Sequence, residues 1–166
     1  MATIFLKWPK IKGSATAAGE SEQYDSGWID ATGASFTVER TVKQGAATAT
    51  NREAAHPVIS KISVSKPLDK SSVYLFQESV VGKPQEVLIH LCSPNAQGKM
   101  RPYAIYKLTN CIISQFKHTG ESEGQPKEEL QLAWTKIEFE FKQASEDNKS
   151  LTSMKIGYDL AKNVAS

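Results

Sequence analysis

Apolar and polar residues alternate along much of the chain, which is the pattern of strands that bury one face. In the run 58–65, Val58, Ile62 and Val64 fall on one side and lysine and serine on the other. The run 86–92 is almost continuously apolar, which predicts a strand covered on both faces. Further strands are predicted at 3–8, 27–42, 102–117 and 127–142, with a last short one through Tyr158.

The alternation in 127–142 changes phase half-way along. Its large apolar residues occupy even positions up to Trp134 and odd positions from Ile137 onward. A slip of one residue turns every following side chain to the other face of a sheet. We therefore predict a β-bulge at Thr135–Lys136, which bends the strand as strands bend at the corners of small barrels.

One stretch has the period of a helix, at about residues 71–81. Asp69, Ser71 and Ser72 are suitable N-cap residues. Gly82 stands where a left-handed glycine ends many helices. The apolar stripe that we expect to pack on a sheet consists of Val73, Phe76 and Val80, with Leu75 alongside.

Length and charge restrict the class of protein. A chain of 166 residues is expected to form one domain, residues 1–166. Lysine and arginine number 20 against 18 acidic residues, and their scatter argues against a nucleic-acid partner. No apolar run is long enough to span a bilayer, so we expect no direct membrane insertion. The N-terminal residues lack the long apolar core and cleavage site of a secretory signal, so folding in the cytoplasm is expected.

The candidate chemistry is sparse. His90 and Cys92 stand two apart on one predicted strand and share a face, a geometry that can supply two metal ligands. A second ligand pair at a suitable spacing is lacking, so we expect both residues to be structural. Cys92 and Cys111 lie in apolar strand patterns and are expected as reduced thiols. The sequence carries no nucleophile elbow or phosphate-binding loop, and we expect no catalytic residues, cofactor or metal.

Two polar segments are candidate interaction surfaces. The stretch 44–57 has no large apolar residue, which predicts a long exposed arm for docking or ring stacking. Alternating charges on 136–142 predict a solvated stripe, or a polar wall past which cargo moves. The candidate arm residues are Gln44, Gly45, Thr48, Thr50, Asn51, Arg52, Glu53 and His56. The candidate wall residues are Lys136, Glu138, Glu140 and Lys142.

The amino-acid sequences of several segments resemble those of a known family. These segments are ISVSKPLDKSSVYLFQESVVGK, EVLIHLC, YKLTNCIIS, TGESEGQPKEELQLAWTKIEFEF and GYDLAKN, in this order. Together they resemble the Hcp (haemolysin-coregulated) tube proteins of bacterial type VI secretion systems. The likeness covers nearly the whole chain, although the loop after Gly13 has no clear counterpart.

The resemblance implies a mainly β fold, a compact antiparallel β-barrel of two sheets with the helix at about 71–81 packed on its side. It also implies six copies in a ring, and rings stacked into the inner tube. The implied partners are other copies of the chain, a spike protein, a contractile sheath and effectors carried in the lumen. Such a tube assembles in the cytoplasm and is then secreted without a signal peptide, and the family offers no catalytic residues to transfer.

Two other functions fit the same sequence. The first is an Hcp-like ring that binds effectors but builds no tube. The second is a monomeric β-barrel module that binds a small ligand such as a carbohydrate or a lipid. Dependence of secretion on the apparatus separates the first from a tube subunit, and a saturable small ligand on a monomer identifies the second.

Overall fold

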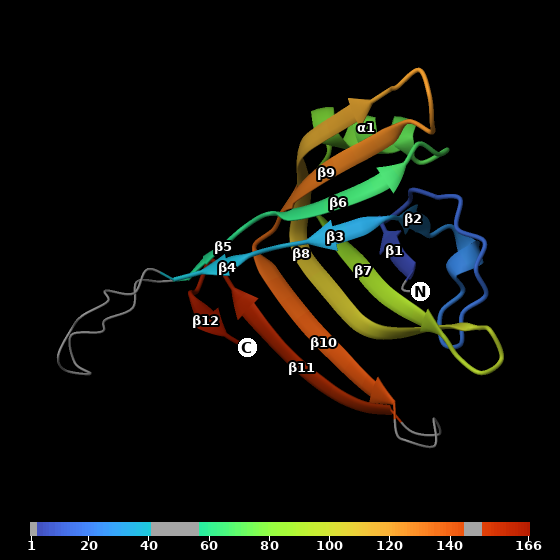
Figure 1. The fold of residues 1–166 in the computed structure, drawn as a ribbon. Coiled ribbons are helices and arrows are strands. Elements are labelled where there is room, and N and C mark those ends of the chain that lie inside the picture. Colours follow the sequence, from blue (N-terminus) through green and yellow to red (C-terminus); the bar gives the residue numbers. More distant parts are fainter. Residues whose placement is uncertain (1–2, 41–56, 145–150) are drawn as a thin grey trace, which may run out of the picture.

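A computed structural model describes residues 3–40, 57–144 and 151–166 (Figure 1). The described chain folds into strands, one α-helix and a short 3-10 helix. The strands are β1 (Thr3–Lys7), β2 (Ile29–Ala31), β3 (Gly33–Ser35), β4 (Val38–Glu39), β5 (Val58–Ile59), β6 (Ile62–Pro67), β7 (Gln85–Pro94), β8 (Met100–Thr119), β9 (Lys127–Ala133), β10 (Lys136–Ala144), β11 (Leu151–Asp159) and β12 (Val164–Ala165). The helices are η1 (Tyr24–Ser26) and α1 (Ser72–Val81).

The strand pairings form a closed antiparallel succession. Strand β1 pairs with β2 and β7, β7 pairs with β8, and β8 pairs with β9. Strand β9 then pairs with β6, and β6 pairs with β3, which follows β2 after the single residue Thr32. The predicted fold class is therefore confirmed: an antiparallel, mainly β barrel of two sheets with one helix on its side (Figure 1).

Strand β8 belongs to both sheets. Its first half pairs with β7 and β10, and its second half pairs with β9. Asn110 has φ +51° at the change-over, and the register with β9 shifts between Ile113 and Gln115. Asparagine tolerates this left-handed conformation better than most residues. The strand predicted at 102–117 is thus one long, bent strand.

The predicted bulge at Thr135–Lys136 is wrong. Strand β9 ends at Ala133 and β10 begins at Lys136, and the two strands belong to different sheets. Thr135 donates its N–H to the Thr109 carbonyl at 3.1 Å, while its own carbonyl accepts from Leu160 at 2.8 Å. The change of phase therefore marks a chain that leaves one sheet for the other.

The run 58–65 also divides, into β5 and β6. Ile62 and Val64 are buried as predicted, whereas Val58 is 69% exposed because β5 pairs only with the short β4. The alternation correctly predicts the buried side of β6, the strand that enters the barrel. The prediction fails at Val58, which lies beyond the barrel wall, where none of the described residues covers its side chain.

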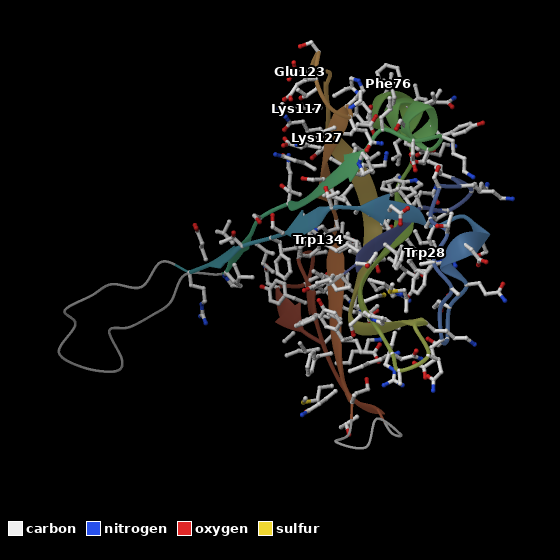
Figure 2. The ribbon with its side chains drawn as sticks, turned by 45° about the vertical axis from the view of Figure 1, so that its right-hand side comes forward. Trp28, Phe76, Lys117, Glu123, Lys127 and Trp134 are labelled. Carbon is white, nitrogen blue, oxygen red and sulfur yellow. The ribbon has the colours of Figure 1, made fainter. Side chains whose placement is uncertain are left out.

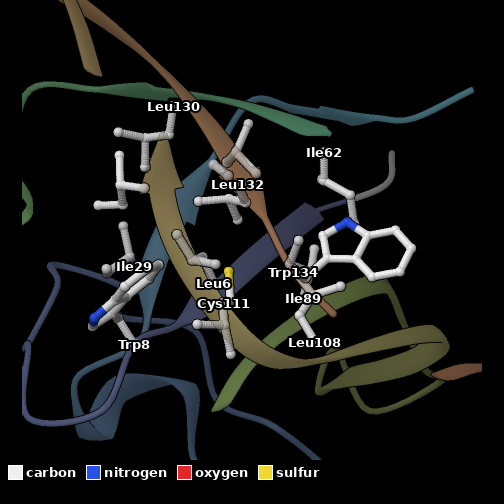
Figure 3. Close-up of a cluster of buried hydrophobic side chains, with 14 of the residues drawn as sticks. Leu6, Trp8, Ile29, Ile62, Ile89, Leu108, Cys111, Leu130, Leu132 and Trp134 are labelled. Atoms are coloured by element: carbon white, nitrogen blue, oxygen red, sulfur yellow. The ribbon is translucent and has the colours of Figure 1, made fainter. Parts of the chain in front are cut away.

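The barrel interior is filled by aliphatic and aromatic side chains from both sheets (Figure 3). Trp134 is 6% exposed and lies among them. Cys111 is a buried free thiol, and burial raises its pKa to about 12, so it packs as a small apolar residue. The labelled core residues are Leu6, Trp8, Ile29, Ile62, Ile89, Leu108, Cys111, Leu130, Leu132 and Trp134.

The segment between β1 and β2 covers the outer face of the neighbouring strands. Phe5 stacks on Tyr24 with ring centroids 4.1 Å apart, and Tyr24 meets Trp28 edge-on at 5.0 Å. Gly13 brings this loop against β2 so closely that a Cβ there would lie 2.4 Å from Ile29 Cα. This segment is thus packed down at Tyr24 and Trp28, which are both buried.

Tyr24 links His90 and Cys92 in this outer cluster. Cys92 Sγ lies 3.1 Å from Tyr24 Oη, which lies 2.9 Å from His90 Nδ1. Burial lowers the pKa of His90 to about 4, and Lys142 and Lys7 add to the shift. The neutral ring can accept the Tyr24 hydroxyl hydrogen. The described residues include no group of three or more His, Cys, Asp or Glu arranged for a metal ion.

Buried charges hold α1 to the barrel at its N-terminal end. The fully buried Lys66 ammonium lies 2.8 Å from Glu128 Oε2 and 3.0 Å from Asp69 Oδ1. It also donates to Ser72 Oγ at 3.1 Å, and that hydroxyl donates to Glu128 at 2.9 Å. The other Glu128 oxygen lies 3.3 Å from His118 Nδ1. Every charge in this network therefore has a partner, as a buried charge requires.

The predicted capping residues form hydrogen bonds within this network. Asp69 accepts hydrogen bonds from the N–H and the hydroxyl of Ser71. Burial raises the Asp69 pKa, but the bonds from Ser71 and Lys66 outweigh it and leave the pKa below its usual value. Gly82 differs from the prediction: its φ is −65° and its ψ 153°, which is extended backbone and not the left-handed conformation.

Replacing Lys66 with methionine is expected to lower the free energy of unfolding by about 3–5 kcal/mol, because Glu128 loses its buried counter-ion. Urea denaturation measures the change. The double variant Lys66→Met/Glu128→Leu should recover most of the loss. The matched control is Lys117→Met, which breaks an exposed pair with Glu129 and should cost less than about 1 kcal/mol. Equal losses in Lys66→Met and the control would contradict this assignment.

His90 is expected to make stability fall with acidification. Above about pH 6.5 both folded and unfolded chains hold it neutral, so its contribution is constant. Between about pH 6.5 and 4 only the unfolded chain gains the proton, which removes up to about 3 kcal/mol; below that window the loss levels off. Urea denaturation from pH 7 to 4 measures this slope. His90→Asn should flatten it, and an unchanged slope in that variant would contradict the assignment.

Candidate assembly surfaces

Helix α1 buries little of itself. Of its ten residues only Ser72 and Leu75 are buried, and Leu75 is the apolar side chain that anchors it over the barrel. Gly82 closes its C-terminal end by donating its N–H to the Glu78 carbonyl at 2.9 Å. The helix therefore presents most of its circumference outward.

The predicted buried stripe of α1 is wrong. Val73 is 72% exposed, Phe76 56% and Val80 66%, although Phe76 makes an edge-on contact with Phe116 at 5.9 Å. Figure 2 shows Phe76 on the helix at the outer end of the molecule. The anchored N-terminal end turns Leu75 inward, so the stripe faces out. We call the outward side the helix face; it consists of Val73, Tyr74, Phe76, Val80 and Val81.

A second apolar face lies on β10 and β11. Register pairs Phe139 with Ile156 and Phe141 with Met154, so these four side chains share one side of the sheet. Tyr106 of β8 stacks on Phe139 at 4.9 Å on the same side, which is the side that faces the barrel core. Strands β10 and β11 thus extend the core-facing surface past the barrel, where the second sheet no longer covers it.

A groove of about 260 Å³ separates this surface from the β4–β5 ribbon. Its walls are almost entirely apolar and include Phe36, Val38, Ile59, Phe139, Ile156 and Tyr158. Four large side chains remain exposed, two in the groove wall and two further along the same side of β10 and β11. We call them the sheet face; they are Val38 at 54%, Phe141 at 39%, Met154 at 55% and Ile156 at 60%.

The predicted charged stripe occupies the opposite side of β10. Lys136, Glu138, Glu140 and Lys142 alternate with the apolar residues of that strand and are all half-buried. Glu138 forms an ion pair across the sheet with β11, and Glu140 forms one with a lysine of its own strand. Lys155 Nζ lies 3.2 Å from Glu138, and Lys142 Nζ lies 3.8 Å from Glu140. A hydrogen bond from Lys155 outweighs partial burial and holds the Glu138 pKa below its usual value.

The predicted docking arm lies outside the described residues. This applies to Gln44, Gly45, Thr48, Thr50, Asn51, Arg52, Glu53 and His56. Strands β4 and β5, which flank that stretch, pair with each other; β4 ends at Glu39 and β5 begins at Val58. The structure therefore places the ends from which the arm departs beside the sheet face.

Sequence patterns did not identify the two apolar faces as surfaces. The phase change in 127–142 predicts only that Phe139 and Phe141 lie on the other face of a sheet, and the apolar stripe of α1 is predicted to be packed. Both readings recognised the apolar side chains. The local sequence does not show how far the second sheet extends over these side chains, and that extent decides whether they are buried.

Comparison with known proteins gives a family and a fold. The family model "Type VI secretion system effector, Hcp" matches residues 5–141. A comparison with curated protein sequences finds no match. Among solved structures, one described as a type six secretion system protein has TM-score 0.86 at 19% identity and covers 100% of both chains. Hcp1 from Salmonella typhimurium has TM-score 0.71 at 15% identity, covering 99% of both chains. A type VI secretion system effector from Yersinia pestis has TM-score 0.56 at 19% identity, covering 94% of this chain and 98% of its own.

At these identities the structural likenesses establish the fold, while the family model covers most of the sequence. The barrel, its single helix and the residues quoted for the resemblance therefore agree with one another. The chain belongs to the Hcp family of type VI secretion systems, and it is a subunit of their tube.

Proposed function

We propose that six copies of this chain close into a ring and that such rings stack to form the inner tube. The observation that carries the proposal is the apolar surface that one copy leaves in water. Thirteen large apolar side chains in the described part of the chain are exposed, and many of them gather on the helix face and the sheet face. A solitary soluble domain rarely exposes contiguous patches of this kind, which mark contact with other chains.

The two sides of β10 and β11 differ in polarity, which supports a different role for each side in the ring. The apolar side, with Phe141 and Ile156, is suited to contacts between subunits. The ion-paired side, with Glu138 and Lys142, is suited to a polar wall of the lumen, because paired, hydrated charges give passing effectors no apolar surface to adhere to. The arm, residues 44–57, is the proposed contact between stacked rings.

The remaining partners follow from the place of a tube in the apparatus. The spike protein is proposed to cap one end of the stack, and the contractile sheath to surround it. Assembly in the cytoplasm and export by the apparatus without a signal peptide complete the proposal. In the described residues no helix has the length and apolar content needed to cross a membrane.

The mass of the purified chain tests the ring. We expect a species of six times 18.2 kDa by size exclusion with light scattering, and rings in negative-stain electron micrographs. Dilution should shift the mass toward 18.2 kDa, because the contacts are intermolecular. A monomer at micromolar concentration would refute the ring, and saturable binding of a small apolar ligand would then support a ligand-binding module.

Deleting residues 45–55 tests the arm. We expect the shortened chain to keep its ring mass but to lose tube formation and apparatus-dependent secretion, because the deletion leaves the barrel strands intact. Electron microscopy of concentrated protein and immunoblots of culture medium measure the two effects. The matched control deletes residues 121–124, in the exposed turn between β8 and β9. Unchanged stacking and secretion in the arm variant would refute its role.

A further inference from the structure

A groove lined by lysines runs along one flank of α1, where the helix faces the loop at 9–12. It consists of two hollows that share Tyr74 as a lining residue. One hollow, of about 470 Å³, lies near the start of the helix, and the other, of about 340 Å³, lies near its end. We call it the basic groove; the residues that define it are Lys10, Lys12, Lys70, Tyr74, Glu78 and Lys83.

The four lysines of the basic groove lack acidic partners. All four are exposed, and within the described residues none of their ammonium groups forms an ion pair with a carboxylate. Several lysines elsewhere on the surface are paired, such as Lys117 with Glu129. Glu78 is the one carboxylate among the described lining residues. The groove therefore has a positive charge that attracts an anionic partner.

Lys10 holds a backbone conformation that is unusual for its residue type. Its φ is +66°, whereas the other non-glycine residues with positive φ in the described chain are both asparagines. The left-handed region is unfavourable for a residue with a long side chain. Backbone strain of this kind persists where the surrounding structure maintains it, commonly at binding sites. Here Ile11 donates its N–H to the Trp8 carbonyl at 3.2 Å, and the turn so closed places Lys10 at the groove.

Glu78 carries a hydrogen-bond acceptor that the folded chain leaves unused. Its Oε2 atom is buried, and no donor among the described residues forms a hydrogen bond with it. The nearby Gly82 N–H donates instead to the backbone carbonyl of Glu78, at 2.9 Å. A buried acceptor without a donor is costly. This oxygen therefore suits a ligand that donates a hydrogen bond inside the groove.

We propose that the basic groove binds a short acidic segment of a partner protein in an extended conformation. Carboxylates of the segment pair with the lysines, and one of its backbone N–H groups donates to Glu78 Oε2. The ten residues of α1 measure about 15 Å along the helix axis. An extended chain rises about 3.3 Å per residue, so about five residues span the groove from Lys70 to Lys83. The partner is not a copy of this chain, so the proposal goes beyond the ring.

An acidic peptide fits the groove better than other anions do. A phosphate group would pair with the lysines, but it has no N–H to donate to Glu78, whose charge would repel it. A peptide offers an acidic side chain and a backbone donor within one residue. Tyr74 is 56% exposed and belongs to both hollows, so the segment can lie across its ring. Val73 and Val81 add apolar walls for a nonpolar side chain between the acidic ones.

Binding of a labelled peptide to the purified wild-type protein tests the proposal. The probe is fluorescein-labelled Asp-Glu-Leu-Glu-Asp with blocked ends, and the control peptide is Asn-Gln-Leu-Gln-Asn with the same label. Fluorescence anisotropy should show saturable binding of the acidic probe, weakened by salt, and no binding of the control. Lys10→Glu/Lys83→Glu should weaken binding by about tenfold or more, because each reversal replaces attraction with repulsion.

The matched variant is Lys61→Glu/Lys162→Glu, which makes the same charge change at exposed lysines outside the groove. It should alter the affinity by less than about twofold, because salt screens charges that lie far from the peptide. Circular dichroism and urea denaturation check that both variants fold. A wild type that does not bind the probe, or equal losses in the two variants, would refute the groove as its site.

Glu78 gives a second readout that net charge cannot explain. Glu78→Leu removes a negative charge, which alone would tighten the binding of an acidic peptide, but it also removes the acceptor. We expect binding about fivefold weaker than wild type, because the peptide N–H loses its partner. Glu78→Gln keeps an acceptor oxygen and should bind at least as tightly as wild type. Tighter binding by Glu78→Leu would overturn the hydrogen bond assigned to this residue.

Other occupants give different results in the same experiments. If Lys10→Glu/Lys83→Glu loses a ring that the wild type forms in light scattering, the occupant is a second copy of this chain. If a single-stranded DNA oligonucleotide displaces the probe at a lower concentration than unlabelled peptide does, the occupant is a nucleic acid. Either result would overturn the proposal. A monomeric wild type that binds the acidic probe would refute the ring and support this site.

Discussion

The membership of β8 in both sheets is the constraint on which the rest of the structure depends. Its first half pairs with β7 and β10 and its second half with β9, with Asn110 at the change-over. The bend lets one strand close the barrel through β9 and β6. It also sends β10 and β11 away from that closure, so their core-facing side leaves the shelter of the second sheet. The closed barrel and the uncovered apolar surface thus have a single geometrical cause.

Helix α1 also leaves apolar side chains exposed, because few of its residues are buried against the barrel. Its anchoring relies on Leu75 and on the buried charges of Lys66 and Glu128. A buried ion pair contributes little net stability, but it demands particular partners and so fixes orientation. With orientation set by polar groups, the apolar residues of the helix are free to face outward. An apolar anchor along the whole helix would have hidden the surface on which assembly is proposed to depend.

The sequence predicted strands well because alternation is local, as Ile62 and Val64 show. The sequence failed to predict burial where a side chain is covered, or left uncovered, by segments far away in the chain. Helix α1 is apolar around most of its circumference, so periodicity could not decide between Leu75 and Val73 as the buried side. The phase change after Trp134 was correctly located but misread as a bulge, because a change of sheet gives the same pattern. Lys66 and Glu128 occupy the inward-facing positions of β6 and β9, where the alternation expects apolar side chains, and only the folded chain reveals that the two charges meet.

The two-residue period of a strand allows one pair of strands to serve both surfaces of the proposed ring. On β10, Phe139 and Phe141 point to one side and Glu138 and Glu140 to the other, and β11 continues the division with Ile156 and Lys155. A contact surface must exclude water, whereas a passage must hold it. Helices separate such properties only over a broad arc, but a sheet separates them across its own thickness. A thin tube wall that adheres to its neighbours and not to its cargo is therefore within reach of a single layer of β-structure.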